Sequence, residues 1–200
     1  DVKVGNGSFN STIEISRELS QSLVSVAKGA GLKCEAIITD MNQVLGKSAG
    51  HTLEMLECIK YLKNEIKDYR LEKITNELIS SLLMMVHKIS KEDALKKIEQ
   101  VLSNGTAAEK FEKMTSALGG PKNILSTYET DLRNESKARD IFSDKEGWIE
   151  KIHTRELGLI LIELGGGRKQ VSDKINYGVG YDRVISVGEK IDSTKPLLQL

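Results

Sequence analysis

Apolar residues recur along this chain with two spacings, and the switch between them predicts the order of its elements. Short apolar runs at residues 2–4 and 34–39 indicate buried strands. Between these runs, apolar residues return at helical spacing, namely at Ile15, Leu19, Leu23, Val26 and Ala30. A strand, a helix and a second strand in this order favour a right-handed crossover between two adjacent parallel strands.

Residues that cap and stop helices divide the rest of the chain. Ser11 and Glu14 have the spacing of a capping box for the first helix, and Gly31 provides its stop. The later patterns predict helices over residues 52–62 and 71–88, a third that Ser90 caps and a fourth from Thr106 to about residue 119.

The final third of the chain has a different pattern. Residues 131–140 are rich in charge and indicate a linker. A strand at 148–152, a short helix at 154–164 and several strands separated by glycines follow it. We therefore expect an α/β unit with a partly parallel sheet and flanking helices over residues 1–134, followed by a smaller α+β unit over 135–200.

The composition argues against nucleic-acid binding, a disulfide and a membrane span. Twenty-nine basic and 29 acidic residues give a formal net charge of zero, so no basic excess is available to bind nucleic acid. Cys34 falls in a strand pattern and Cys58 on a helix, so reduced core thiols are expected rather than a disulfide. The longest apolar run, residues 157–164, is too short to span a bilayer.

Three short strings carry the most specific information. The second strand leads into DMNQVLGKSAGHTLE at residues 40–54, the chain begins with DVKVGNGSF at residues 1–9, and LGGGR at 164–168 precedes DKINYGVG at 173–180. In this order and spacing they resemble the thymidine phosphorylase and pyrimidine-nucleoside phosphorylase family over essentially the whole chain. The resemblance implies a nucleoside phosphorylase fold, with a catalytic α/β domain that is incomplete here and an α+β C-terminal domain.

The resemblance also implies a reaction. The family cleaves thymidine with inorganic phosphate, reversibly, to thymine and 2-deoxyribose 1-phosphate, in nucleoside salvage. Its Lys-Ser-Thr-Gly-Gly phosphate loop and the Arg, Ser and Lys that hold the base precede the position of Asp1. We therefore expect an internal fragment of a larger enzyme, with no catalytic residue in this segment and no activity of its own.

A substrate-binding residue is implied in the first glycine loop. Residues 5–9 follow a strand and precede a helix, which places the loop at the carboxyl end of the strand, where open α/β sheets bind ligands. By resemblance, Phe9 forms a wall of the pyrimidine pocket. The alternative is that Phe9 packs on the first helix as a hydrophobic staple.

A cation site is implied in the second string. Some family members hold a potassium ion through two loop carbonyls and one helix carboxylate, at the positions of Leu45, Ser48 and Glu57, with further ligands in the phosphate loop. Oxygen ligands of this kind suit hard cations. The alternative is that Glu57 is a solvated helix carboxylate near Lys60 or Tyr61. No other cofactor is expected.

The glycine triplet at residues 165–167 invites a phosphate-loop interpretation. The triplet comes after a predicted helix, however, and would face the negative end of the helix dipole. A helix C-cap and a tight entry to the next strand account for it better.

Several alternatives stay open at this level. The strings around residues 42–45 and 168–173 favour a thymidine-specific enzyme over a broader pyrimidine-nucleoside phosphorylase, and a non-catalytic remnant is the third possibility. The resemblance implies a cytoplasmic homodimer that takes thymidine and phosphate and binds neither nucleic acid nor membrane.

Overall fold

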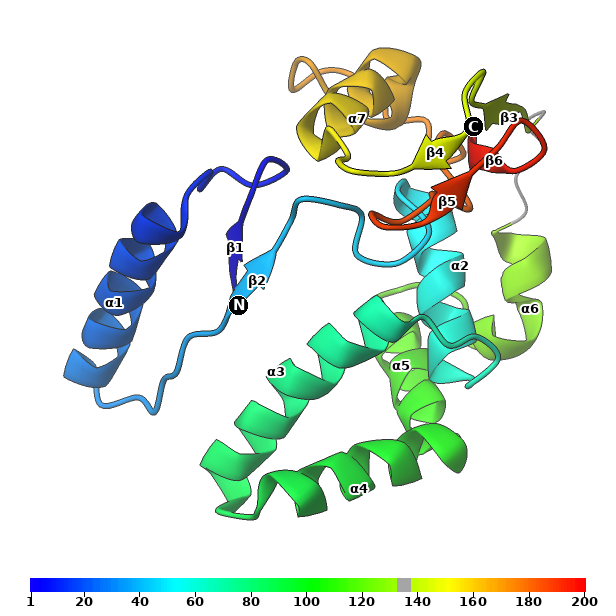
Figure 1. Cartoon of the computed structure of the whole chain (residues 1–200). Helices are drawn as coiled ribbons and strands as arrows, with labels where there is room; N and C mark the ends of the chain where they lie inside the picture. Colours follow the sequence, from blue (N-terminus) through cyan, green and yellow to red (C-terminus); the bar gives the residue numbers. More distant parts are fainter. Residues whose placement is uncertain (133–137) are drawn as a thin grey trace.

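The first two strands lie side by side and run parallel, as the sequence predicts. The computed structural model of the chain describes residues 1–132 and 138–200 (Figure 1). Strand β1 (Val2–Val4) pairs with β2 (Ile38–Asp40), and Val2 lies opposite Ile38. Strand β2 begins later than the apolar run at 34–39 suggested. The carboxyl ends of both strands meet at one edge of the pair, which is where their loops carry the candidate site.

Helix α1 (Ile13–Gly29) connects these strands, but two details differ from the prediction. Its N-cap is Thr12, whose hydroxyl accepts from the Ile15 amide, and not Ser11. Its buried residues are Ser16 and Ser20, whereas the predicted apolar row is exposed. The small serines allow close packing on β1, where the Ser16 hydroxyl donates to the Lys3 carbonyl.

Between β2 and residue 132 the structure has five helices, where the sequence predicted four. They are α2 (His51–Leu62), α3 (Tyr69–His87), α4 (Lys91–Ser103), α5 (Thr106–Ala117) and α6 (Ile124–Asp131). Ser90 caps α4 as expected, by accepting from the Asp93 amide at 3.1 Å. The sequence pattern missed α6, because its eight residues carry too few apolar positions to show a period.

The missed helix supplies much of the hydrophobic core. Ile59 of α2 packs with Ile124 and Tyr128 of α6, and these three residues are 0%, 3% and 5% exposed. Leu56, Phe111, Leu125 and Leu132 surround them and are partly buried. The core therefore lies among α2, α5 and α6, to one side of the parallel strands.

Both cysteines carry free thiols, but they are not core residues as expected. Cys34 is half-buried and precedes β2, and Cys58 is exposed on α2. Cys58 is next to the fully buried Ile59, and successive helical residues point about 100° apart. The burial of Ile59 in the core therefore turns the Cys58 thiol outward.

The C-terminal region is a mixture of short strands and one helix, as the pattern predicts, but the strand expected at residues 148–152 covers only Gly147–Trp148. Strand β3 (Asp140–Phe142) pairs antiparallel with β6 (Pro196–Gln199), and β4 (Gly147–Trp148) pairs antiparallel with β5 (Lys190–Ile191). Helix α7 (Thr154–Leu161) continues into a π-helical turn, η1 (Ile162–Gly166). The expected domain boundary at residues 134 and 135 lies outside the described residues. No described helix has the length and apolar content needed to cross a membrane.

A seam of backbone pairing joins this region to the segment after β2. Ala49 and Tyr181 exchange both backbone hydrogen bonds, at 2.9 and 2.7 Å. Gly50 and Gly180 lie beside this bridge, and a Cβ added to Gly180 would come within 2.7 Å of the Ala49 carbonyl oxygen. Figure 1 shows the C-terminal strands beside the first turns of α2.

The seam makes Gly180 sensitive to a single methyl group. We expect Gly180→Ala to lower the free energy of unfolding by about 1–3 kcal/mol, because the seam must open to admit the Cβ. The matched control is Gly158→Ala in α7, where an added Cβ meets nothing within 4 Å. This control should gain roughly 0.5–1 kcal/mol from helix propensity. Urea unfolding of the two variants measures both values, and equal stabilities would contradict the seam.

Candidate functional site

The glycine loop at residues 5–9 leaves the carboxyl end of β1. Gly5 has a φ of 115°, in the left-handed half of conformational space that other residues avoid. The loop closes on itself through the Ser8 amide, which donates to the Gly5 carbonyl at 3.0 Å. The Gly7 amide donates to the Met41 carbonyl at 3.0 Å, so the loop is also fixed to the segment after β2.

Phe9 projects from this loop into solvent. Its side chain is 99% exposed, so it does not pack on α1 as a staple. An exposed aromatic ring at the carboxyl edge of the strands can cover a planar base at no cost to the core. Its place in the pyrimidine pocket stays a prediction.

Two asparagines that the sequence interpretation passed over hold the loops together. The Asn42 Oδ1 accepts from the Asn6 amide at 2.9 Å and from the Asn6 Nδ2 at 3.2 Å. A Cβ on Gly5 would lie 2.7 Å from the same Oδ1, so Gly5 is needed for this close approach. A signal for this contact was present in the sequence, because each loop that follows a parallel strand contains an asparagine.

Glu57 turns back toward the loop before its own helix. Its Oε1 accepts from the Lys47 amide at 2.7 Å, and its Oε2 accepts from the Ser48 hydroxyl at 2.6 Å. The solvated orientation toward Lys60 is therefore not the one observed. Ser48 is buried, and the carboxyl oxygens lie so close to Gly46 that a Cβ there would come within 2.5 Å of either.

The chemistry of the three candidate ligands, Leu45, Ser48 and Glu57, fits a hard cation. The Ala49 amide donates to Tyr181, and within one trans peptide unit the carbonyl points opposite to the amide, so the Ser48 carbonyl faces away from Tyr181. Within residues 1–132 and 138–200, the Leu45 and Ser48 carbonyls accept no hydrogen bond and Glu57 has no basic partner. Two free carbonyls and an unneutralised carboxylate match the oxygen ligands that such ions prefer.

Lys47 joins the same segment to the C-terminal region. Its Nζ donates to the Ser186 hydroxyl at 2.6 Å and to Glu189 Oε1 at 2.8 Å. Burial alone would raise the pKa of the Glu189 carboxyl, but its bonds from Lys195, Lys47 and the Ser186 amide lower that pKa to about 2. Glu189 is therefore ionised throughout the physiological range. The sequence interpretation missed this cluster, because Lys47 lies more than 130 residues before Ser186 and Glu189.

A cavity of about 650 Å³ opens between β2 and the start of α3. Arg70 crosses it, donates to the Asp40 carbonyl and lies 3.3 Å from the Asp40 carboxylate. Burial and the nearby Arg70 charge lower the pKa of the Lys3 ammonium. Three acidic and three basic side chains line this cavity, so it favours no single charge of ligand: Asp40, Asp68, Glu77, Lys47, Arg70 and Lys73.

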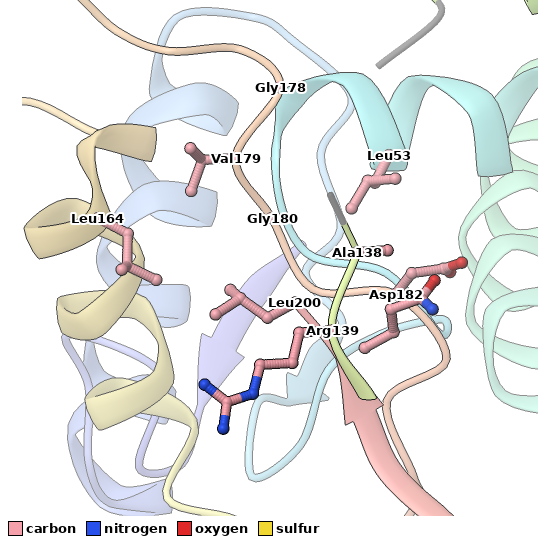
Figure 2. A pocket seen from close by; sticks show the side chains of 10 residues that line it. Leu53, Ala138, Arg139, Leu164, Gly178, Val179, Gly180, Asp182 and Leu200 are labelled. Atoms are coloured by element: carbon pink, nitrogen blue, oxygen red, sulfur yellow. The ribbon is translucent and has the colours of Figure 1, made fainter. Parts of the chain in front are cut away.

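A second cavity, of about 380 Å³, lies where the YGVG string meets α2 (Figure 2). Figure 2 shows Leu53 and Leu164 on opposite sides of it and the Arg139 side chain lower in the view, beside Leu200. This lining is mainly apolar, with Asp182 as its acidic group. Among the described residues no hydrogen bond or ion pair joins its two charged side chains, Arg139 and Asp182, so the lining favours packing over acid–base chemistry.

The glycine triplet behaves as a helix end. Gly165 has a φ of 92°, and its carbonyl accepts from the Asn176 amide at 2.8 Å. The C-cap interpretation is confirmed, and the triplet is no phosphate loop. Across the described residues, no three histidine, cysteine or acidic side chains gather as a metal cluster would require.

Comparison with known proteins gives two matches. Residues 148–200 match the family described as the pyrimidine nucleoside phosphorylase C-terminal domain. The whole chain is 41% identical, over 201 aligned residues, to a thymidine phosphorylase of Colwellia psychrerythraea. The chain spans 46% of the length of that relative.

The Glu189 cluster predicts a pH-dependent stability. The pKa of Glu189 is depressed to about 2 from an ordinary value of 4.5, so the stabilisation is complete above pH 4.5 and is lost as the pH falls toward 2. Glu189→Gln should lower the free energy of unfolding at pH 7 by about 1–2 kcal/mol, after a discount for its partial exposure. The loss should shrink in urea titrations from pH 5 to pH 3.

Glu163→Gln is the control for this change, because the Glu163–Lys169 pair is exposed on both sides. The control should change stability by less than about 0.5 kcal/mol at pH 7. A Glu189→Gln loss that is the same at pH 7 and pH 3 would contradict the ionic origin.

Proposed function

The chain belongs to the thymidine and pyrimidine nucleoside phosphorylase family, and we propose that its protein carries out the reversible phosphorolysis of thymidine. The products are thymine and 2-deoxy-α-D-ribose 1-phosphate. The observation that carries the proposal is 41% identity to a thymidine phosphorylase across the whole chain. We further propose a cytoplasmic homodimer that serves nucleoside salvage.

The reaction divides into tasks that this chain can and cannot perform. Phosphate needs backbone amides and cations, and the departing base needs donors for its developing negative charge. By family resemblance, those groups come from a part of the enzyme that precedes residue 1. The residues of this chain bind and orient: Phe9 covers the base, and the loop at residues 5–9 sets where that ring lies.

The segment at residues 41–50 acts as the scaffold for this work. Its Asn42 fixes the glycine loop, and its Lys47 and Ser48 bind the Glu57 carboxylate. Leu45, Ser48 and Glu57 would hold a potassium ion through two carbonyls and the carboxylate. A bound ion would supply positive charge that offsets the Glu57 carboxylate.

An assay of the complete polypeptide tests the function. We expect thymine release from thymidine only when inorganic phosphate is present, with 2-deoxyribose 1-phosphate formed in equal amount. The 200-residue chain by itself should release none, because the phosphate and base ligands are implied outside it. Uridine cleavage at a similar kcat/KM would favour the broader pyrimidine specificity, and hydrolysis without phosphate would overturn the proposal.

The cation site has a separate test in Glu57→Gln. The amide keeps the shape and can still accept from the Lys47 amide, but it removes the charge that faces an ion. Potassium chloride should raise the melting temperature of the parent more than tetramethylammonium chloride at equal ionic strength, and Glu57→Gln should abolish the difference.

The matched control is Glu54→Gln, one turn earlier on the same helix. Glu54 accepts from the Gly50 amide at 2.9 Å and does not face the Leu45 to Ser48 loop. The control should keep the potassium response. A Glu57→Gln variant that responds to potassium as the parent does would rule out these ligands and leave the phosphorylase proposal standing.

A further inference from the structure

We propose that Asn6 is a positioning residue that ties the Phe9 loop to the first turn of α7 in the C-terminal region. The proposal rests on the proposed nucleoside site, because it assigns Asn6 a role in placing the ring that covers the base. Asn6 does not itself touch the substrate in this scheme. It acts by holding the backbone three residues before Phe9.

The side chain of Asn6 reaches two backbone groups far along the chain. Its Nδ2 donates to the Ile152 carbonyl at 3.0 Å, and its Oδ1 accepts from the Arg155 amide at 3.4 Å. Arg155 lies in the first turn of α7, where helix amides lack partners within the helix. The N-cap residue His153 makes no capping bond, so Asn6 supplies the capping oxygen from 149 residues away.

Asn6 is also hydrogen-bonded to the segment after β2. Its amide and its Nδ2 both donate to Asn42 Oδ1, at 2.9 and 3.2 Å. The neighbouring Gly7 is confined between the same two regions, because an added Cβ would lie 2.7 Å from the Met41 carbonyl oxygen and 2.9 Å from the Thr154 methyl. Figure 1 shows the loop after β1 reaching toward the chain that enters α7.

Phe9 depends on this anchoring because its ring has no packing of its own. At 99% exposure, only the loop backbone fixes where the ring points. Loss of the Asn6 bonds would let the loop sample more conformations, and nucleoside binding would then cost additional ordering. Coupling between two sites is reciprocal, so bound base should in turn protect the first turn of α7.

The kinetic test uses Asn6→Ala in the complete polypeptide. We expect the KM for thymidine to rise roughly tenfold, the size that loss of one or two hydrogen bonds allows, while the KM for phosphate stays within about twofold. Asn10→Ala is the matched control, since Asn10 lies next to the same loop and, among the described residues, its side chain bonds only the Lys3 carbonyl, at 3.4 Å. This control should leave both constants within about twofold.

A double-mutant cycle separates positioning from general damage. If Asn6 acts through Phe9, Asn6→Ala should add little to Phe9→Ala, whereas independent effects would add in free energy. If Asn6→Ala folds poorly, Asn6→Ser replaces it in the test. The serine side chain is too short to reach both the Ile152 carbonyl and the Arg155 amide. Additive effects in the cycle, or equal rises for Asn6→Ala and Asn10→Ala, would overturn the proposal.

Hydrogen exchange gives a readout that does not depend on turnover. Amides in a peptide covering residues 154–161 should exchange faster in Asn6→Ala than in the parent, and thymine should slow them in the parent but not in the variant. Unchanged exchange in the variant would overturn the Asn6–α7 link. If the complete polypeptide cleaves no nucleoside while this link is observed, the proposed function fails and the anchoring stands without its role in positioning Phe9.

Discussion

The pairing of Ala49 with Tyr181 is the contact on which the geometry of both candidate sites depends. It uses both backbone hydrogen-bonding groups of Ala49, at 2.9 and 2.7 Å. Because a trans peptide is rigid, this also fixes the direction of the Ser48 carbonyl, one of the candidate ion ligands. The same segment, residues 41–50, contains Asn42, which holds the glycine loop, so one run of chain orients the Phe9 loop and the candidate ion ligands together.

The seam around this bridge is formed largely by polar groups. Lys47 lies between Ser186 and Glu189, and the Gln43 side chain accepts from the Val187 amide at 3.0 Å. Contacts of this kind add little net free energy when formed, but an unpaired partner left in a half-buried site is costly. The seam therefore specifies one relative placement of the two regions more than it strengthens their association.

The elements were largely predictable from local pattern, and the site was predictable only in part. Periodicity identified the parallel strands and four of the helices after β2, because each buries one face and repeats its apolar positions. It missed α6, whose eight residues are too few to show a period. It also placed the cap of the first helix at Ser11, because it could not distinguish the Ser11 hydroxyl from that of Thr12. Family strings pointed to Glu57 and Phe9, but the link from Asn6 to Arg155 joins residues 149 apart and leaves no local trace.

The large sequence separation between the two sides of the seam also affects when the protein can fold during synthesis. Lys47 leaves the ribosome 139 residues before Ser186, so at typical synthesis rates it waits about 7–28 seconds for its partner. During that interval the Ser48 carbonyl lacks the peptide pairing that directs it, and the glycine loop lacks its α7 anchor. The local elements can form early, but their final arrangement is completed only after the last third of the chain has emerged. We therefore expect the slow step of folding to be the closure of the loop between Lys47 and Ser186.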